Sequence, residues 1–273
     1  MESRTTYDVS RRRFLRSVGT GAIGVAIFGI AAAACSSENT GVTTTGAATG
    51  ATTGAPTTTA GISTTTATVV STTGASATDL VSSRRVDLDF VSAYVIERGD
   101  GLVVIDTGAS GSAPAIEAVL GEYGKSWSDV GYVIATHKHG DHVGSWNPVI
   151  DAASGASIFA GGLDIPSIAS GRPITVLADG DMVNGLATIA TPGHTQGHIS
   201  MLDPVLGLFT GDALNGSDGG VIGPNPQFTP DMDTALESVR RLGTFEYEAA
   251  FFGHGEPLLS GASVAVQALV ESL

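Results

Sequence analysis

The chain has 273 residues, which is long enough for one or two domains with a hydrophobic core that needs no disulfide. It carries 13 lysine and arginine residues against 27 aspartate and glutamate residues, and this formal net charge of -14 disfavours a nucleic-acid partner. The single cysteine excludes an intrachain disulfide bond.

The first 35 residues have the layout of an export signal. An arginine-rich start is followed by an uncharged stretch at residues 17–34 that is rich in glycine and alanine. The run SRRRFL at residues 10–15 resembles a twin-arginine signal, whose pathway exports folded proteins. A membrane-spanning helix is the alternative for residues 17–34, and the glycines weaken it. We therefore expect a signal peptide at residues 1–35 and an extracytoplasmic protein.

Cys35 follows four alanines, residues 31–34, at the end of this signal. The position resembles a lipoprotein processing site, although Ala32 stands where a leucine or valine is usual. A lipid on Cys35 would anchor the protein to the cell membrane, and we expect no other membrane contact. Residues 36–79 are almost wholly Thr, Gly, Ala and Ser. This composition predicts a disordered linker with a span of about 30–40 Å.

From residue 80 to residue 273, apolar runs typical of strands alternate with helical spacing, which predicts an α/β domain. Strands are expected at residues 86–97, 102–106, 132–136, 157–160, 188–191, 199–203, 208–211 and 249–252. Helices are expected at residues 113–123, 142–153, 231–242 and 261–273, with Asp231 as an N-cap. Segments 161–171 and 215–229 are expected to be loops that line a pocket.

All six histidines fall in three short clusters. These are the run HKHGDH at residues 137–142, the run HTQGH at residues 194–198, and His254. Asp212 lies between the second cluster and the third. Imidazole and carboxylate are ligands that divalent transition metals prefer, so the pattern predicts a site for two metal ions.

These motifs resemble the metallo-β-lactamase superfamily over about residues 80–260. The resemblance rests on the runs DTG at 106–108, THKHGDH at 136–142, TPGH at 191–194, GD at 211–212 and GHG at 253–255. It implies an α/β fold in the form of a four-layer αββα sandwich, with two mixed sheets between outer helices.

Seven metal ligands are expected, in two groups. The first ligand group is His137, His139 and His194. The second ligand group is Asp141, His142 and His254. Asp212 resembles the carboxylate that bridges the two ions in this superfamily.

The two ions would lie about 3.5 Å apart and share a water or hydroxide. Zinc is the expected metal, and iron or manganese also suit these ligands. Asp141 would be the catalytic residue that orients the nucleophile or carries a proton to the leaving group. Asp106 and His198 are expected to support the ligands without binding metal, and Lys138 is expected to point outward.

The segments TPGHTQGH and FTGD look most like those of hydroxyacylglutathione hydrolases and related thioesterases. The resemblance implies a dinuclear hydrolase that attacks an ester, thioester or lactone of a small molecule with a metal-bridging hydroxide. Only 19 residues follow His254, so we do not expect the helical region that holds glutathione in those enzymes, or a preference for glutathione thioesters. The alternatives are a persulfide dioxygenase with one iron and a binding lipoprotein that contains metal.

Overall fold

The computed structural model describes residues 81–99 and 101–273. The predicted signal peptide (1–35), Cys35 and the predicted linker (36–79) lie outside these described residues. Within them, no helix has both the length and the apolar character needed to cross a membrane.

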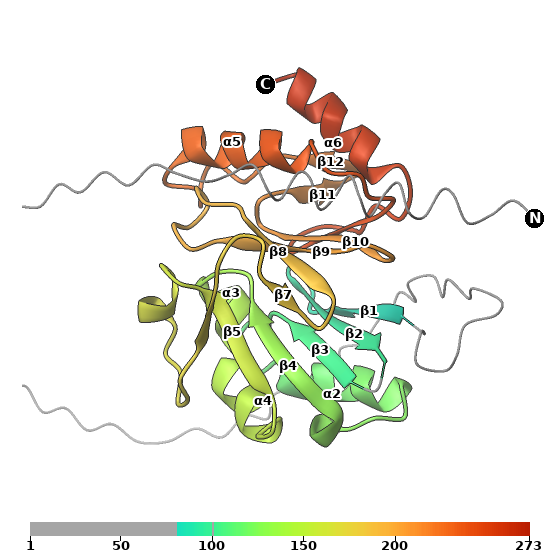
Figure 1. The fold of residues 1–273 in the computed structure, drawn as a ribbon, viewed down its shortest axis with the longest axis vertical. Coiled ribbons are helices and arrows are strands. Elements are labelled where there is room, and N and C mark those ends of the chain that lie inside the picture. Colours follow the sequence, from blue (N-terminus) through green and yellow to red (C-terminus); the bar gives the residue numbers. More distant parts are fainter. Residues whose placement is uncertain (1–80, 100) are drawn as a thin grey trace, which may run out of the picture. The chain divides into compact units, whose positions relative to one another are not determined.

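Six strands form the first sheet, in the order β1-β2-β3-β4-β5-β6 (Figure 1). Their bounds are Val81–Asp87, Ser92–Arg98, Gly101–Ile105, Val130–Ala135, Ser157–Gly161 and Thr175–Leu177. The first three strands are antiparallel, and β3 to β6 run parallel. Parallel strands require crossovers, which here contain the helices α2 (Ala113–Glu122), α3 (Gly140–Val143) and α4 (Trp146–Ala152).

Five strands form the second sheet, in the order β13-β10-β9-β8-β7. In chain order these are β7 (Met182–Val183), β8 (Leu186–Ala190), β9 (Ile199–Asp203), β10 (Gly207–Gly211) and β13 (Ala250–Phe252). Only the β10–β13 pair among them is parallel. A hairpin of β11 (Asn215–Ser217) and β12 (Gly220–Ile222) follows β10.

The two sheets face each other between two outer layers of helices (Figure 1). Helices α2 and α4 cover the first sheet, and α5 (Met232–Leu242) and α6 (Ala262–Glu271) cover the second. Strand β3 shows how alternation builds both cores, because Leu102 and Val104 pack toward α2 while Val103 and Ile105 pack between the sheets. This is the expected αββα sandwich.

The expected strand at residues 86–97 is wrong, because a turn at residues 88–91 separates β1 from β2. Asp89 has a φ of 74°, and Leu88 N–H donates to Val91 O at 3.1 Å. Apolar residues on both sides of the turn concealed it in the sequence pattern. The turn brings Phe90 to the predicted ligands.

The expected helix at residues 142–153 is also wrong in part, because the chain leaves helical geometry between α3 and α4. Ser145 Oγ donates to Ala109 O at 2.6 Å and accepts from Ser112 N at 2.8 Å. The loop after β3 therefore holds Ser145 at the break. This break separates the short helix that carries Asp141 and His142 from α4.

Three further features complete the comparison with the sequence. Segments 161–171 and 215–229 were expected to be loops that line a pocket. The second contains the β11–β12 hairpin and lines the pocket at the predicted ligands, whereas the first contributes no residue to that pocket. Asp231 is the N-cap of α5 and accepts from Thr234 N at 3.1 Å, as predicted. Asp203, the last residue of β9, is buried and paired with Arg98.

Candidate metal centre

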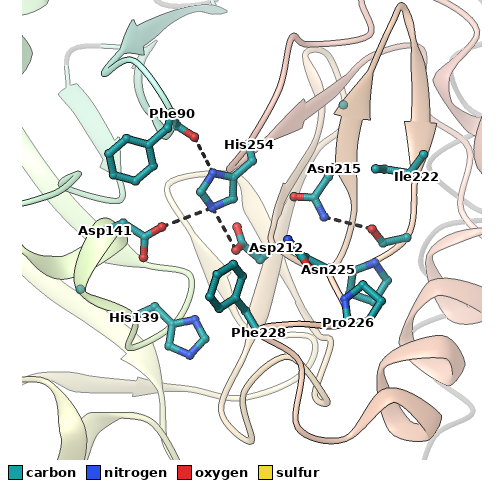
Figure 2. A pocket seen from close by; sticks show the side chains of 14 residues that line it. Phe90, His139, Asp141, Asp212, Asn215, Ile222, Asn225, Pro226, Phe228 and His254 are labelled. Atoms are coloured by element: carbon teal, nitrogen blue, oxygen red, sulfur yellow. Dashed lines mark hydrogen bonds and ion pairs between the residues drawn. The ribbon is translucent and has the colours of Figure 1, made fainter.

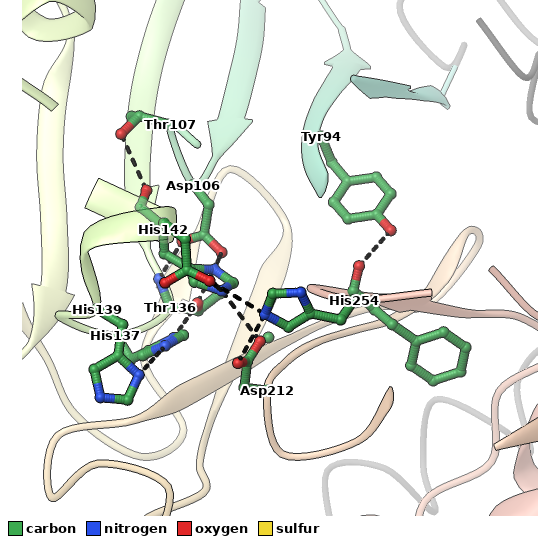
Figure 3. Close-up of polar contacts among 12 residues, drawn as sticks. Tyr94, Asp106, Thr107, Thr136, His137, His139, His142, Asp212 and His254 are labelled. Carbon is green, nitrogen blue, oxygen red and sulfur yellow. Dashed lines mark hydrogen bonds and ion pairs between the residues drawn. The ribbon is translucent and has the colours of Figure 1, made fainter. Parts of the chain in front are cut away.

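Strands β4, β8, β10 and β13 deliver the predicted ligands to one edge of the sandwich. Figure 3 shows His137, His139, His142, Asp212 and His254 gathered there. Each ligand segment begins where a strand ends: residues 136–142 follow β4, residues 191–194 follow β8, Asp212 follows β10 and His254 follows β13. The carboxyl ends of these strands lie side by side, and all seven predicted ligands belong to clusters that could hold a metal ion.

The nitrogen atoms of the first ligand group converge. His139 Nδ1 lies 3.0 Å from His137 Nε2 and 2.8 Å from His194 Nε2. His137 and His194 are buried, and His139 is half-buried. Three imidazole nitrogens at this spacing suit a single divalent ion.

The second ligand group lies beside the first. His254 Nε2 lies 3.3 Å from Asp141 Oδ2, and His142 Nε2 lies 3.8 Å from the same oxygen. His142 is fully buried, whereas the side chains of Asp141 and His254 are 30% and 31% exposed. The second group is therefore the more accessible side of the centre.

Asp212 faces both ligand groups. Its Oδ2 lies 3.3 Å from His194 Nε2 and 3.2 Å from His254 Nε2. Its Oδ1 lies 3.2 Å from His142 Nε2. This is the position expected of a carboxylate that two ions share.

Hydrogen bonds behind the imidazole rings fix where their lone pairs point. The Thr136 hydroxyl donates to Asp106 Oδ2 at 2.8 Å, so it can only accept from His137 Nδ1, which is 3.1 Å away. His254 Nδ1 donates to the Phe90 carbonyl at 2.5 Å. Nε2 of both rings therefore faces the centre, with a free lone pair on the neutral His137 and with one on His254 once that ring gives up its proton.

Two buried atoms that face each other also lack a well-aligned hydrogen bond. Among the described residues these are His142 Nε2 and Asp212 Oδ1, which lie 3.2 Å apart. A nitrogen lone pair and a carboxylate oxygen this close repel each other unless a proton or a metal cation lies between them. The residues therefore fit divalent metal ions.

Burial sets the protonation of the first ligand group. It lowers the pKa of His137 well below the usual range, lowers the pKa of His139, and lowers the pKa of His194 to about 4. Burial disfavours a charged ring, so these histidines are neutral at pH 7.

Carboxylates set the protonation of the second ligand group. Hydrogen bonds to Asp141 and Asp212 raise the pKa of His254 to about 10. Burial opposes protonation of His142 most strongly, but Asp212 and Asp106 outweigh it and raise the pKa of His142 well above the usual range. Without metal, this group holds protons between its nitrogens and the carboxylates.

Asp106 supports the second ligand group from behind. Its Oδ2 lies 2.7 Å from His142 Nδ1, and its Oδ1 accepts from Thr136 N at 2.8 Å. The carboxylate is buried and lies at the end of β3, where the φ of Asp106 is 60°. Asp106 thus fixes His142 and the start of the loop that carries this ligand and three others, His137, His139 and Asp141.

His198 supports Asp212. Its Nε2 accepts from Asp212 N at 3.0 Å, so the proton is on Nδ1, which lies 2.8 Å from Thr191 Oγ1. Burial lowers the pKa of His198 to about 3 and keeps the ring neutral, as this arrangement requires. His198 is not in any of the clusters that could hold a metal.

Asp164 is a supporting residue that the sequence analysis missed. Its carboxylate is fully buried and accepts from Thr195 Oγ1 at 2.5 Å, from Gly197 N at 2.9 Å and from Lys138 N at 3.1 Å. Lys138 lies between two histidines of the centre, and Thr195 follows His194. Asp164 therefore joins the two loops of the first ligand group. A lone acid in the otherwise uncharged segment 161–171 was the available signal.

Two glycines allow the loops to approach this closely. A Cβ at Gly211, whose φ is 53°, would lie 2.7 Å from His198 Nε2 and 2.9 Å from Thr136 Cβ. A Cβ at Gly253 would lie 2.7 Å from His142 Cε1. The glycines beside Asp212 and His254 are thus needed for packing inside the centre.

A pocket of about 1100 Å³ opens over the centre (Figure 2). Four residues of the centre line its floor, namely His139, Asp141, Asp212 and His254. The remaining wall comes from the β1–β2 turn, the β11–β12 hairpin and the segment that follows it. A reacting bond can therefore reach the second ligand group from solvent.

Comparisons with known proteins agree with this architecture. The uncharacterized protein YobT of Bacillus subtilis (strain 168) is 27% identical over 210 residues, which is 66% of this chain and 89% of YobT. The thioesterase pkgB of Emericella nidulans is 24% identical over 178 residues. That alignment covers 64% of this chain, which spans about half (48%) of the fungal protein.

Solved structures show the same fold. The structure of TTHA1623 in a di-iron-bound form has a TM-score of 0.56 and 24% sequence identity, and the match covers 67% of this chain and 95% of that one. Residues 86–160 and 172–254 match the model of the Metallo-beta-lactamase superfamily. More than half of the sequence is matched, and the chain belongs to the metallo-β-lactamase superfamily, whose members are mostly metal-dependent hydrolases.

Proposed function

We propose that the chain is an exported hydrolase that cleaves an ester, thioester or lactone bond of a small molecule with two divalent metal ions. One observation carries the proposal: the oxygens of Asp212 lie 3.2 Å from His142 Nε2 and 3.3 Å from His194 Nε2, which belong to different ligand groups. A carboxylate placed in this way suits two ions that share it.

The proposed ligands are the seven predicted residues. Bound there, a pair of divalent cations supplies Lewis-acid polarisation of a carbonyl group and lowers the pKa of water. Nitrogen and oxygen ligands favour Zn²⁺ as our choice. The di-iron-bound form of TTHA1623 makes iron the competing choice.

Asp141 is the residue to which we assign proton transfer. Its side chain lines the pocket and is 30% exposed, against 8% for Asp212. The hydrogen bond with His254 lowers the pKa of Asp141, so the group is a carboxylate at neutral pH. It can accept a proton from the attacking water and pass it to the leaving atom.

In the proposed reaction, the oxygen of water bonds to the carbonyl carbon while the carbon–oxygen or carbon–sulfur bond breaks. The leaving oxygen or sulfur takes one proton of the water, and the products are a carboxylic acid and an alcohol or thiol. A lactone gives both groups in one molecule. The similarity to the thioesterase pkgB supports a thioester among these substrates.

Export and membrane anchoring are proposed from the sequence alone. Replacing Arg11 and Arg12 by lysine should retain the protein in the cytoplasm, since a twin-arginine signal depends on that pair. The variant Cys35→Ser should release the exported protein from the membrane fraction. Unchanged fractionation of both variants would contradict this part of the proposal.

The central experiment measures metal content together with hydrolysis. Purified protein is assayed by elemental analysis and against a panel of esters, thioesters and lactones, beside the variant His139→Ala. We expect two metal ions per chain and hydrolysis that the variant loses. One iron per chain with oxygen consumption on persulfides would favour the dioxygenase alternative. Two metal ions without turnover of any substrate would favour a binding lipoprotein.

A further inference from the structure

The pocket over the metal centre has uncharged walls. Apart from the four residues of the centre, its lining consists of phenylalanine, isoleucine, proline, asparagine and glycine. The largest wall side chains are Phe90, Phe228 and Ile222, which are 59%, 56% and 50% exposed. Apolar side chains exposed around a few polar groups are typical of a surface that a ligand covers.

The two phenylalanines flank the reacting region. Phe90 lies on the β1–β2 turn, with its ring stacked 6.4 Å from the His254 ring at an angle of 14°. Phe228 lies in the segment after β12. Figure 2 shows Asp141, Asp212 and His254 between the two rings. An apolar group between the rings would therefore lie next to the ligands.

Hydrogen bonds connect the chain at each phenylalanine to a ligand histidine. The carbonyl of Phe90 accepts from His254 Nδ1 at 2.5 Å. Phe228 precedes Thr229, whose Oγ1 lies 3.1 Å from His194 Nδ1. The backbone of Phe228 is also fixed, because its N–H donates to Asn225 O at 3.1 Å. The backbone at Phe90 is thus tied to the second ligand group, and the backbone next to Phe228 is tied to the first.

The arginine side chains of the described residues are engaged elsewhere. No lysine or arginine in the described part of the chain lines the pocket. The arginines form other contacts, which are Arg84–Glu122, Arg85–Glu256, Arg98–Asp203, Arg240–Glu237, Arg241–Asp179 and Arg172 with the carbonyl of Ile150. A carboxylate or phosphate on the substrate would therefore meet no cationic side chain on these walls.

Building on the proposed function, we propose that the substrate is an uncharged ester or thioester whose apolar acyl chain lies between Phe90 and Phe228. Burial of apolar surface against the two rings supplies the binding free energy. A substrate with an anionic acyl chain loses solvation on these walls and gains no ion pair.

Two p-nitrophenyl esters test this inference on metal-loaded protein. p-Nitrophenyl hexanoate and mono-p-nitrophenyl adipate have acyl chains of six carbons and differ by a terminal carboxylate. We expect kcat/KM to be at least about tenfold higher for the hexanoate, because the terminal carboxylate of the adipate would lose solvation on these walls without gaining an ion pair. A rate for the adipate that equals or exceeds that for the hexanoate would overturn the inference and leave the hydrolase proposal intact.

Variants locate the effect on the walls. Phe90→Ala and Phe228→Ala should each raise KM for the hexanoate about tenfold with little change in kcat, because they remove binding that does not change along the reaction. Ile222→Lys should shift the preference toward the adipate. Met182→Ala is the matched control, since Met182 is 56% exposed and lies outside the pocket lining. Phenylalanine variants that behave like this control would overturn the inference.

A binding measurement tests the pocket walls even if the proposed hydrolysis fails. If neither ester is hydrolysed, the hydrolase proposal fails on these substrates, but the anilides of the same acids still report on the walls. Equilibrium dialysis with N-(4-nitrophenyl)hexanamide and the adipic monoanilide should show tighter binding of the neutral compound, weakened by Phe90→Ala. Equal binding of the two anilides would overturn the inference.

Discussion

The two ligand groups of the metal centre use similar residues but differ in charge. In the first ligand group, burial lowers the pKa of every histidine. In the second, carboxylates raise the pKa of both histidines. The neighbours explain the difference: among the described residues, Asp212 is the only carboxylate within ion-pair distance of the first group, whereas Asp141 and Asp106 add to it in the second.

This difference implies that the two metal positions are not equivalent. A divalent ion can bind the neutral nitrogens of the first ligand group without displacing a proton. At the second ligand group it must displace the protons of His142 and His254. We therefore expect the first position to fill before the second as metal is added at neutral pH.

The largest expected effect is on the pH dependence of metal affinity. Each displaced proton weakens binding about tenfold per pH unit, so two protons weaken the second position about 10⁴-fold between pH 8 and pH 6. The first position should change less than about tenfold, because burial holds its histidine pKa values low, to about 4 for His194. Chelator-competition titrations measure both affinities.

Two variants isolate the positions for these titrations. His254→Ala leaves the first ligand group intact, and His139→Ala leaves the second intact. The two variants should have clearly different slopes of affinity against pH. Equal slopes would contradict the assigned protonation states and remove the distinction between the groups.

Asp212→Asn tests what the two groups share. It removes one negative charge next to His142, His194 and His254, at nearly constant volume. We expect kcat/KM to fall more than about 100-fold, beyond the 10–100-fold typical of a supporting residue, with weaker metal binding at both positions. Asp179→Asn, a surface carboxylate paired with Arg241, is the control. Two retained metals and a loss below tenfold would argue against a shared ligand.

Variants of the two supporting aspartates should each weaken metal binding mainly at one position, by less than Asp212→Asn does. Asp164 joins the loops of the first ligand group, and Asp106 lies behind His142 of the second. Asp164→Asn should weaken metal binding mainly at the first position, and Asp106→Asn mainly at the second, each by about 10–100-fold. The same titrations measure this. Identical losses from both variants would show that each carboxylate supports the whole centre.

Elements that depend on neighbouring residues could be predicted from the sequence. Local patterns were sufficient for β9, whose bounds match residues 199–203, and for the Asp231 cap of α5. Alternation along β3 likewise follows from its apolar residues. These features depend on neighbours in the chain, so periodicity and capping rules apply to them.

The positions of Asp164 and Phe90 could not be predicted, because they depend on contacts between residues far apart in the chain. The partners of Asp164 lie at residues 138, 195 and 197, and no local pattern marks that convergence. Phe90 lies in what looked like a continuous strand, and its contact with His254 spans 164 positions. The metal ligands could be predicted because histidine is rare in this chain and its positions are clustered. The residues of the pocket walls could not be predicted, because they are of common types.

The smallest expected effect is on the stability of the metal-free protein, where the two groups should act in opposite directions. The pKa of His194 is lowered to about 4, so the unfolded chain, with a pKa near 6.5, binds a proton that the folded protein does not as pH falls between these values. Stability from the first ligand group is therefore lost toward acid. The pKa of His254 is raised to about 10, so its contribution is fully present below pH 6.5 and is lost as pH rises to about 10.

Calorimetry of the metal-free protein from pH 4 to pH 10 measures how Tm depends on pH. The Tm should fall below pH 6.5 because of the first ligand group (the acid limb) and above pH 6.5 because of the second (the alkaline limb). Relative to the unsubstituted protein, His194→Gln should flatten the acid limb and His254→Gln the alkaline limb, each by several degrees in Tm. Because the His254 side chain is 31% exposed, solvent screening should make its limb the shallower one. If either variant flattens the opposite limb, the contrast in protonation between the two ligand groups is wrong.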